Sequence, residues 1–263
     1  MESQSILQPV GRAALHPPHC PVGQTQANGA TLKAGTLNKT LLNPTPMLLQ
    51  PEQRTKLDES NDAHFYDVPR FVTHVDEGFI NRLTYLYRQR LTPHSRVLDL
   101  MSSWVSHLPE EMPFDWVEGH GLNIEELAKN PRLNHCFVQN LNENPHLPLE
   151  DKSFDAVLNT VSVQYLQQPE VVFAEIHRVL KPGGVAIVSF SNRMFYQKAI
   201  AAWRDGSESN RVELVKRYFK AVPSFSAPEV IAYVSPVPGF LQMLGLAMAD
   251  PFYAVVASRL PSV

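Results

Sequence analysis

Two strand-like runs of the sequence carry polar side chains at or near their C-terminal ends. Asp99 lies near the C-terminal end of the run RVLDL, and Asn159 and Thr160 end the run SFDAVLNT. In an open parallel sheet, ligands bind in the crevice outside the carboxyl ends of the strands. Carboxylate, amide and hydroxyl groups at that edge can hydrogen-bond a small ligand. We therefore expect these three residues to line a binding crevice.

Histidine is the residue type that could do acid-base chemistry there. His107 and His120 are the nearest titratable candidates, because imidazole changes charge near neutral pH. A structural or solvent-exposed histidine is the alternative for both, so no catalytic residue is assigned. His16, His19 and Cys20 are close together in LHPPHCPV, but the prolines prevent helical convergence and no fourth ligand is near. We therefore predict no metal site.

The elements that must position these residues alternate between strand-like and helix-like runs. Helical spacing of apolar residues predicts one helix from Asp76 to about Leu91, and another begins near Pro169 and is stopped by Pro182-Gly183-Gly184. Strand-like runs cover residues 96–100, 115–119, 136–139, 154–160, 185–190 and 252–258, with 228–234 as a weaker candidate. This alternation is typical of an α/β fold with a doubly wound, mostly parallel sheet.

Residues 1–55 differ in composition from the rest of the chain. They contain Pro9, Pro17, Pro18, Pro21, Pro44, Pro46 and Pro51, with few acidic residues. Such a segment buries little apolar surface to offset its chain entropy, so we expect a disordered or loosely attached extension. A cleaved targeting segment is the alternative. The folded domain is expected over residues 65–263.

Composition limits the partners. The formal net charge is −3 with no run of like charges, which disfavours a nucleic-acid partner. No stretch approaches the roughly 18 apolar residues of a membrane span. Two cysteines give neither a disulfide framework nor a four-cysteine zinc site. We expect a soluble cytoplasmic protein, unless the extension directs import into a plastid or mitochondrion; the sequence specifies no oligomeric state.

A longer pattern resembles a known family. RVLDL, then SFDAVLNTVSVQYL, then EIHRVLKPGGVAIVSF are similar to class I S-adenosylmethionine-dependent methyltransferases of the type 11 (UbiE-like) group, over roughly Val97 to Phe190. The resemblance implies a Rossmann-like, seven-stranded, mostly parallel sheet with helices on both faces, and S-adenosylmethionine as cofactor.

The first motif departs from the family pattern. Glycines normally let the backbone after the first strand approach the cofactor. Here Met101, Ser103 and Val105 occupy the glycine positions of D-L-G-x-G-x-G. Either the hydroxyls of Ser102 and Ser103 replace the close backbone approach, which we favour, or Met101 and Trp104 fill the pocket. Trp104 could stack on adenine or lie near the sulfonium; ordinary core packing is the alternative.

The resemblance also assigns residues after the next strands. Gly121 occupies the position of the acid that binds the ribose hydroxyls, and Asn123 is the expected substitute. Asn140 would accept from the adenine amino group, and Leu141 would cover the adenine face. The implied cofactor-binding residues are Asp99, Met101, Ser102, Ser103, Trp104, Gly121, Asn123, Asn140, Leu141, Asn159 and Thr160.

The leading hypothesis is therefore a methyltransferase acting on a small molecule. The aromatic residues of the segment Met194 to Lys220 could cap a small, partly apolar acceptor, or they could simply pack helices on the sheet. Methyl transfer needs mainly proximity and a dry site. The rival hypothesis is a non-catalytic methyltransferase-like binding or scaffold protein, because the glycines and the ribose acid are absent.

Overall fold

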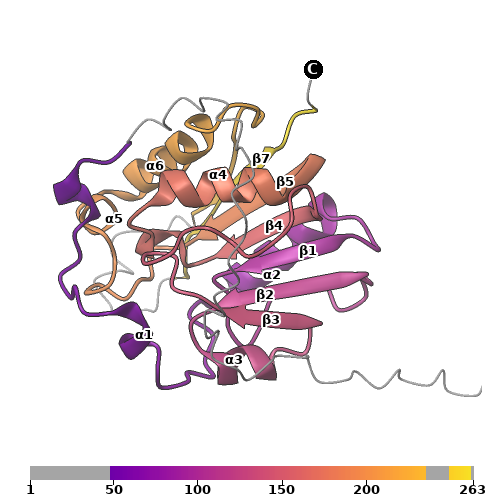
Figure 1. Ribbon diagram of the computed structural model, residues 1–263, viewed down its shortest axis with the longest axis horizontal. Helices are drawn as coiled ribbons and strands as arrows, with labels where there is room; N and C mark the ends of the chain where they lie inside the picture. Colours follow the sequence, from indigo (N-terminus) through magenta and orange to yellow (C-terminus); the bar gives the residue numbers. More distant parts are fainter. Residues whose placement is uncertain (1–47, 235–248, 262–263) are drawn as a thin grey trace, which may run out of the picture.

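A seven-stranded sheet forms the centre of the molecule (Figure 1). The computed structural model describes residues 48–234 and 249–261. The strand order is β3-β2-β1-β4-β5-β7-β6, with β1 to β5 parallel and β7 antiparallel to both β5 and β6. The strands are β1 (Arg96–Leu100), β2 (Trp116–Gly121), β3 (His135–Val138), β4 (Phe154–Thr160), β5 (Leu180–Phe190), β6 (Glu229–Tyr233) and β7 (Phe252–Ser258). The predicted mostly parallel sheet is confirmed.

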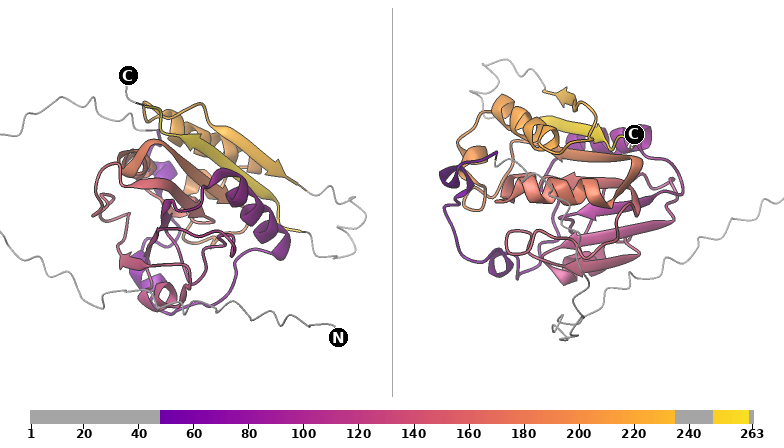
Figure 2. Two further views of the ribbon diagram at one scale, coloured as in Figure 1. Left: turned by 90° about the vertical axis from the view of Figure 1, so that its right-hand side faces the viewer. Right: turned by 45° about the horizontal axis from the view of Figure 1, so that its top comes forward.

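Helices cover both faces of this sheet (Figures 1 and 2). The α-helices are α1 (Asp62–Phe65), α2 (Glu77–Arg90), α3 (Ile124–Lys129), α4 (Pro169–Val179), α5 (Ala201–Arg204) and α6 (Glu208–Lys220); η1 (Pro51–Arg54) and η2 (Val163–Tyr165) are short 3₁₀ turns. Two separate core clusters result, one beneath α4, α5 and α6 and the other beneath α2 and α3. Among the described residues, no helix has the length and apolarity needed to span a bilayer.

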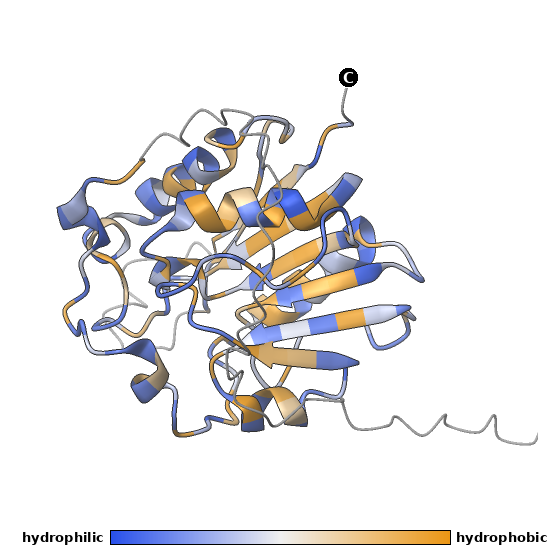
Figure 3. Cartoon of the chain, viewed as in Figure 1, coloured by the Kyte–Doolittle hydropathy of each residue, from blue (hydrophilic) through white to orange (hydrophobic). Residues whose placement is uncertain are grey.

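The central strands place alternate side chains in the two cores. Val97 and Leu158 join the α2 side, whereas Leu98 and Val157 join the α4 side. Strands buried on both faces are nearly continuous apolar runs, which is visible along β1, β4 and β5 (Figure 3). This burial is why these strands were recognisable from sequence.

The chain order reverses at β1. From β1 it continues outward to β2 and β3 on one side, and then returns to β4 on the other. Ligands in such folds bind at this switch point, outside the carboxyl ends of the strands. The segment before α2 runs past these carboxyl ends (Figure 1).

Two local predictions require correction. Helix α4 already ends at Val179, where Leu180 takes an extended conformation, so Pro182-Gly183-Gly184 does not end it. The turn instead lies within β5, where Gly183 has a φ of +82° and donates its N–H to the carbonyl of Arg259. The left-handed backbone that glycine permits therefore shapes the start of a strand.

The N-terminal boundary also lies earlier than the sequence indicated. Residues 48–55, assigned to the extension, pack on the domain: Leu49 is buried, and Arg54 forms an ion pair with Glu170 at 2.5 Å. Arg54 also donates to the carbonyls of Leu49 and Gln167. One buried leucine and a multiply bonded arginine hold the segment in place. The prediction for residues 1–47 lies outside the described residues.

Candidate functional site

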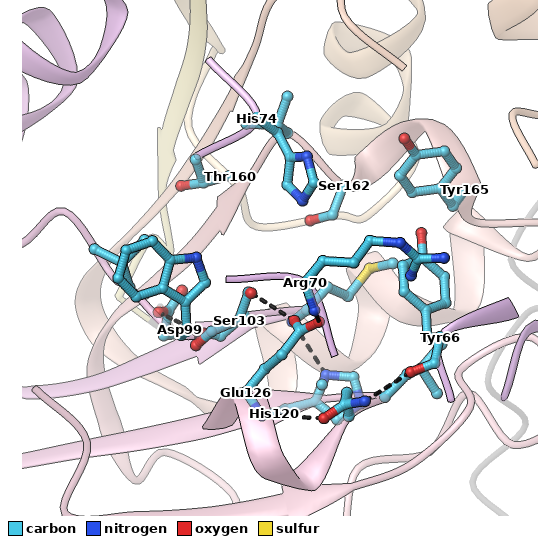
Figure 4. Close-up of a pocket in the computed structure, with 18 of the residues that line it drawn as sticks. Tyr66, Arg70, His74, Asp99, Ser103, His120, Glu126, Thr160, Ser162 and Tyr165 are labelled. Carbon is cyan, nitrogen blue, oxygen red and sulfur yellow. Dashed lines mark hydrogen bonds between the residues drawn. The ribbon is translucent and has the colours of Figure 1, made fainter. Parts of the chain in front are cut away.

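A cavity of about 500 Å³ lies outside the carboxyl ends of β1, β2 and β4 (Figure 4). Ten of the implied cofactor-binding residues line it: Asp99, Met101, Ser102, Ser103, Trp104, Gly121, Asn123, Asn140, Leu141 and Thr160. Asn159 does not line the cavity; it is buried, and its amide nitrogen donates to the carbonyl of Leu100. The structure thus brings together residues from four separate parts of the sequence.

The loop after β1 is held by one histidine. Met101, at the first glycine position of the family motif, has a φ of +58°, the left-handed conformation that favours glycine. His120 in β2 accepts the N–H of Met101 at its Nδ1 (3.1 Å), and its carbonyl accepts the N–H of Ser102 (2.6 Å). Its Nε2 lies 2.9 Å from the carbonyl of Gln139 and donates to it. Burial lowers the pKa of His120 to about 4, so it is neutral.

Asp99 places a buried carboxyl group at the base of the cavity. It is 3% exposed and accepts a hydrogen bond of 2.6 Å from the hydroxyl of Ser102. Burial raises the pKa of Asp99 to about 6, because the charged form is poorly solvated there. A cationic group entering the cavity would stabilise the carboxylate.

The family's ribose acid has no room at its usual position. A Cβ added to Gly121 would lie 2.6 Å from the carbonyl oxygen of Ser102, closer than real Cβ atoms approach backbone. Its expected substitute is already engaged: the Oδ1 of Asn123 caps α3, and its Nδ2 donates to the carbonyls of Tyr66 and Asp67. Asn123 therefore fixes the N-terminal segment beside the cavity.

Another acid lies in the cavity instead. Glu126, in the first turn of α3, is buried and accepts hydrogen bonds of 2.6 Å from the hydroxyl of Ser103 and from the backbone N–H of Arg70. No sequence pattern singled this residue out. Asn123 and Glu126 have the spacing of a helix capping box, which would assign the glutamate to the helix end. Contacts from the segment around Arg70 turn it toward the cavity.

Three further residues implied to bind the cofactor, Asn140, Leu141 and Trp104, also have contacts within the protein. The Oδ1 of Asn140 accepts the N–H of Asn142, and its Nδ2 lies 3.3 Å from Asn61. Leu141 is buried in the core cluster under α4. The indole N–H of Trp104 donates to the carbonyl of Val72, which ties the loop after β1 to the segment before α2.

The end of β4 carries backbone strain. Val161 lines the cavity with a φ of +52°, which a β-branched residue adopts at a cost of about 1–3 kcal/mol. Next to it, the hydroxyl of Ser162 is buried with no hydrogen-bond partner. Thr160, by contrast, is hydrogen-bonded to the hydroxyl of Tyr87 at 2.9 Å. Strained backbone and an unpaired polar group are therefore found together at the end of β4 that borders the cavity.

Aromatic and basic side chains form the other wall, and the sequence did not single out those that come from the segment before α2. Tyr66, Arg70 and His74 come from the segment before α2, and Tyr165 comes from η2. Figure 4 shows these side chains around the cavity, with His74 opposite Ser103 and Glu126. Tyr66, Arg70 and His74 lie far in sequence from β1, so no local pattern pointed to them.

The segment Met194 to Lys220 contributes less than a full cap. Met194 and Phe195 line the cavity. Trp203, Tyr218 and Phe219 are instead buried in the core cluster under α4. Helix packing thus accounts for most of these aromatics.

His107 is the remaining titratable candidate. It lines the cavity, and burial lowers its pKa to about 4, so it is a neutral imidazole there. Its φ of +53° places another non-glycine residue in the left-handed region beside the cavity. Within residues 48–234 and 249–261, no group of three or more His, Cys, Asp or Glu residues could hold a metal ion.

One segment of the chain is similar to a known protein family. Residues 120–188, from β2 to β5, match the family described as a methyltransferase domain. This segment is therefore similar to methyltransferase domains. The matched segment contains His120, Asn123, Glu126 and the end of β4, and therefore much of the cavity wall.

Two curated relatives show the same similarity. The chain is 33% identical over 107 residues to the sterol 24-C-methyltransferase of Schizosaccharomyces pombe, covering 38% of this chain and 28% of that one. It is 35% identical over 57 residues to a malonyl-[acyl-carrier protein] O-methyltransferase of a Marinomonas species, covering 22% and 21%. The chain thus spans less than a third of either relative's length.

A solved structure is similar as well. Phosphoethanolamine N-methyltransferase 2 of Haemonchus contortus, in complex with S-adenosyl-L-methionine, is 17% identical, with a TM-score of 0.48. The match covers 72% of this chain and 54% of that one.

We predict that restoring the family's acid at residue 121 harms the protein. Gly121→Asp and Gly121→Ala should lower the free energy of unfolding by roughly 1–3 kcal/mol, because the new Cβ meets the Ser102 carbonyl. Urea unfolding measures this. Gly78→Ala in α2 is the matched control and should be neutral or stabilising, since its new Cβ would lie 3.1 Å or more from side-chain atoms, with no backbone atom close to it, and alanine favours the helix. Unchanged stability of Gly121→Ala would contradict the close approach.

The contacts of His120 predict how fast the Met101 amide exchanges its hydrogen in two variants. His120→Ala should destabilise the fold by about 3 kcal/mol, because it leaves two backbone groups unpaired and a cavity. His120→Asn can keep an acceptor near Nδ1, whereas His120→Gln can reach only toward Nε2. Hydrogen exchange of the Met101 amide should therefore stay slow in the Asn variant and accelerate in the Gln variant. Equal exchange in both would show that Nδ1 does not hold the loop.

Asp99 predicts a pH dependence of stability. Its folded pKa, about 6, lies above the ordinary value of 3.8, so the folded state binds more protons between these pH values and loses stability as pH rises through them. Asp99→Asn, which keeps an acceptor for Ser102, should be more stable than wild type above pH 6 by up to about 3 kcal/mol, at about 1.4 kcal/mol per pKa unit. The gain should vanish near pH 4. Urea unfolding of both proteins from pH 4 to 8 tests this. A difference in the free energy of unfolding that stays constant over this pH range would refute it.

Proposed function

We propose that this protein is an S-adenosylmethionine-dependent methyltransferase acting on a small-molecule acceptor. One observation carries the proposal: the cavity at the switch point of the sheet is lined by ten of the residues that the resemblance assigns to the cofactor, and Met101, at a glycine position of the motif, has the left-handed backbone that favours glycine. The match of residues 120–188 to the methyltransferase domain family supports the same assignment.

The donor set suits this cofactor. S-Adenosylmethionine carries a sulfonium and an ammonium cation, and the carboxyl groups of Asp99 and Glu126 line the cavity. About 500 Å³ is within the range of small-molecule sites. Asp99 would hold a cationic group, Glu126 would accept from hydroxyl groups, and Leu141 would offer an apolar face to adenine. When bound, the cofactor supplies an activated methyl group.

The chain's own residues position the reactants and exclude water. The Trp104 indole, tied to Val72, and the rings of Tyr66 and Phe195 wall the cavity. In-line displacement benefits from proximity and desolvation, and a base is needed only when the acceptor still holds a proton. His107 lines the cavity as a neutral imidazole and could accept such a proton.

The rival function, a methyltransferase-like binding module, also rests on an observation. The ribose-acid position is closed by the Ser102 carbonyl, and both ends of the Asn123 amide already have partners. With these contacts in place, neither residue 121 nor Asn123 has a free acceptor for the ribose hydroxyls. A measurement of cofactor binding therefore distinguishes the two proposed functions.

Calorimetric titration of the full chain with S-adenosylmethionine and S-adenosylhomocysteine tests the proposal. We expect micromolar binding of both, and loss of at least about tenfold in affinity for Ser103→Trp, which would fill the cavity. Ser209→Trp, on the exposed face of α6, is the matched control and should bind as wild type. No binding of either ligand to the folded chain would overturn the proposal and favour the binding module.

A further inference from the structure

Arg70 places a positive charge against the aromatic wall of the cavity. Its guanidinium carbon lies 4.7 Å from the ring centre of Phe65, 5.7 Å from that of Tyr66 and 5.5 Å from that of Phe195. Its Nη2 donates to the carbonyl of Phe65 at 2.8 Å. Three rings and a backbone oxygen therefore fix the plane of the guanidinium. Arginine held this way has lost its side-chain freedom before any ligand arrives.

This guanidinium lacks an anionic partner. Its Nη1 is buried with no hydrogen-bond partner. None of the ion pairs among the described residues involves Arg70. The Glu126 carboxylate bonds the backbone N–H of Arg70, not its side chain. A buried, charged donor without a partner is unfavourable, so its retention in a cavity indicates a ligand group that completes it.

The surroundings define the shape of that ligand. The Tyr165 and Phe195 rings stack with an interplanar angle of 29° and line the same cavity. Ser162 contributes a buried hydroxyl with no partner, and Figure 4 shows it beside His74. A flat apolar body with an anionic end fits between rings and guanidinium, because carboxylates pair with arginine through directed, charge-assisted hydrogen bonds.

We propose that Arg70 anchors a carboxylate inside the cavity, and that the acceptor is a small planar or apolar carboxylic acid. The inference rests on the proposed function of the cavity as a donor and acceptor site. The amino-acid part of the donor offers the same chemistry from a second source. The experiment below separates the two sources.

Three probes are titrated into the 263-residue chain: benzoate, S-adenosylhomocysteine and methylthioadenosine, which lacks the amino-acid part. The variants are Arg70→Gln, which removes the charge, and Arg70→Lys, which keeps it without the planar fork. Arg88→Gln is the control, because Arg88 is on the exposed face of α2, paired with Glu111. Urea unfolding establishes that each variant is folded.

We expect benzoate to bind wild type and Arg88→Gln equally, and Arg70→Gln at least roughly tenfold more weakly, with partial recovery in Arg70→Lys. An acceptor-borne carboxylate leaves S-adenosylhomocysteine affinity unchanged in Arg70→Gln. A donor-borne carboxylate weakens S-adenosylhomocysteine about tenfold and leaves methylthioadenosine unchanged, which supports the carboxylate site and overturns the acceptor assignment.

The proposal is overturned if folded Arg70→Gln binds benzoate and S-adenosylhomocysteine with wild-type affinity, or if wild type does not bind benzoate and S-adenosylhomocysteine is insensitive to Arg70. These results leave the proposed methyltransferase function intact. Conversely, Arg70-dependent benzoate binding without any binding of S-adenosylhomocysteine keeps the carboxylate site and removes the proposed function.

Discussion

The attachment of the loop after β1 to His120 is the constraint on which the site depends. A left-handed residue that is not glycine raises the energy of the loop, so other contacts must stabilise it. Here the N–H groups of Met101 and Ser102 donate to the ring and to the carbonyl of His120, respectively. Because His120 is buried and neutral, it accepts at one ring nitrogen and donates at the other to Gln139. The parallel pairing of β1 and β2 sets the distance that these bonds require.

The same attachment decides where acidic groups can lie. With the Ser102 carbonyl against Gly121, no side chain fits at the end of β2, and the carboxylate of Glu126 enters the cavity from α3. Ser103 bonds Glu126, while Ser102 bonds Asp99. The two serines of the first motif thus each hold one carboxyl group of the cavity.

The N-terminal segment completes the site by contacts distant in sequence. Asn123 bonds the carbonyls of Tyr66 and Asp67, and a buried ion pair joins Lys56 to Asp62 at 2.6 Å. Lys198, fully buried, lies 3.0 Å from Asp58 and links the segment to the region before α5. Buried ion pairs of this kind are costly to break, because removing one partner leaves an uncompensated charge. The segment therefore forms a fixed wall that carries Arg70.

The sequence by itself determined the framework. The bounds of β1, β4 and β7, and the start of α2 directly after its N-cap Asp76, follow from apolar periodicity and capping, which are local properties of the chain. The residues after β1 and β4 were placed at the cavity for the same reason, since the carboxyl ends of parallel strands share one edge.

Tertiary structure alone decided what those residues contact. Glu126 faces the cavity because Ser103 and Arg70 bond it, and Arg70 is 56 residues away in sequence. Asn123 became a helix cap and a tether, and His120 a support for a strained loop. No periodicity encodes such contacts, because each depends on side chains that only folding brings within hydrogen-bond distance.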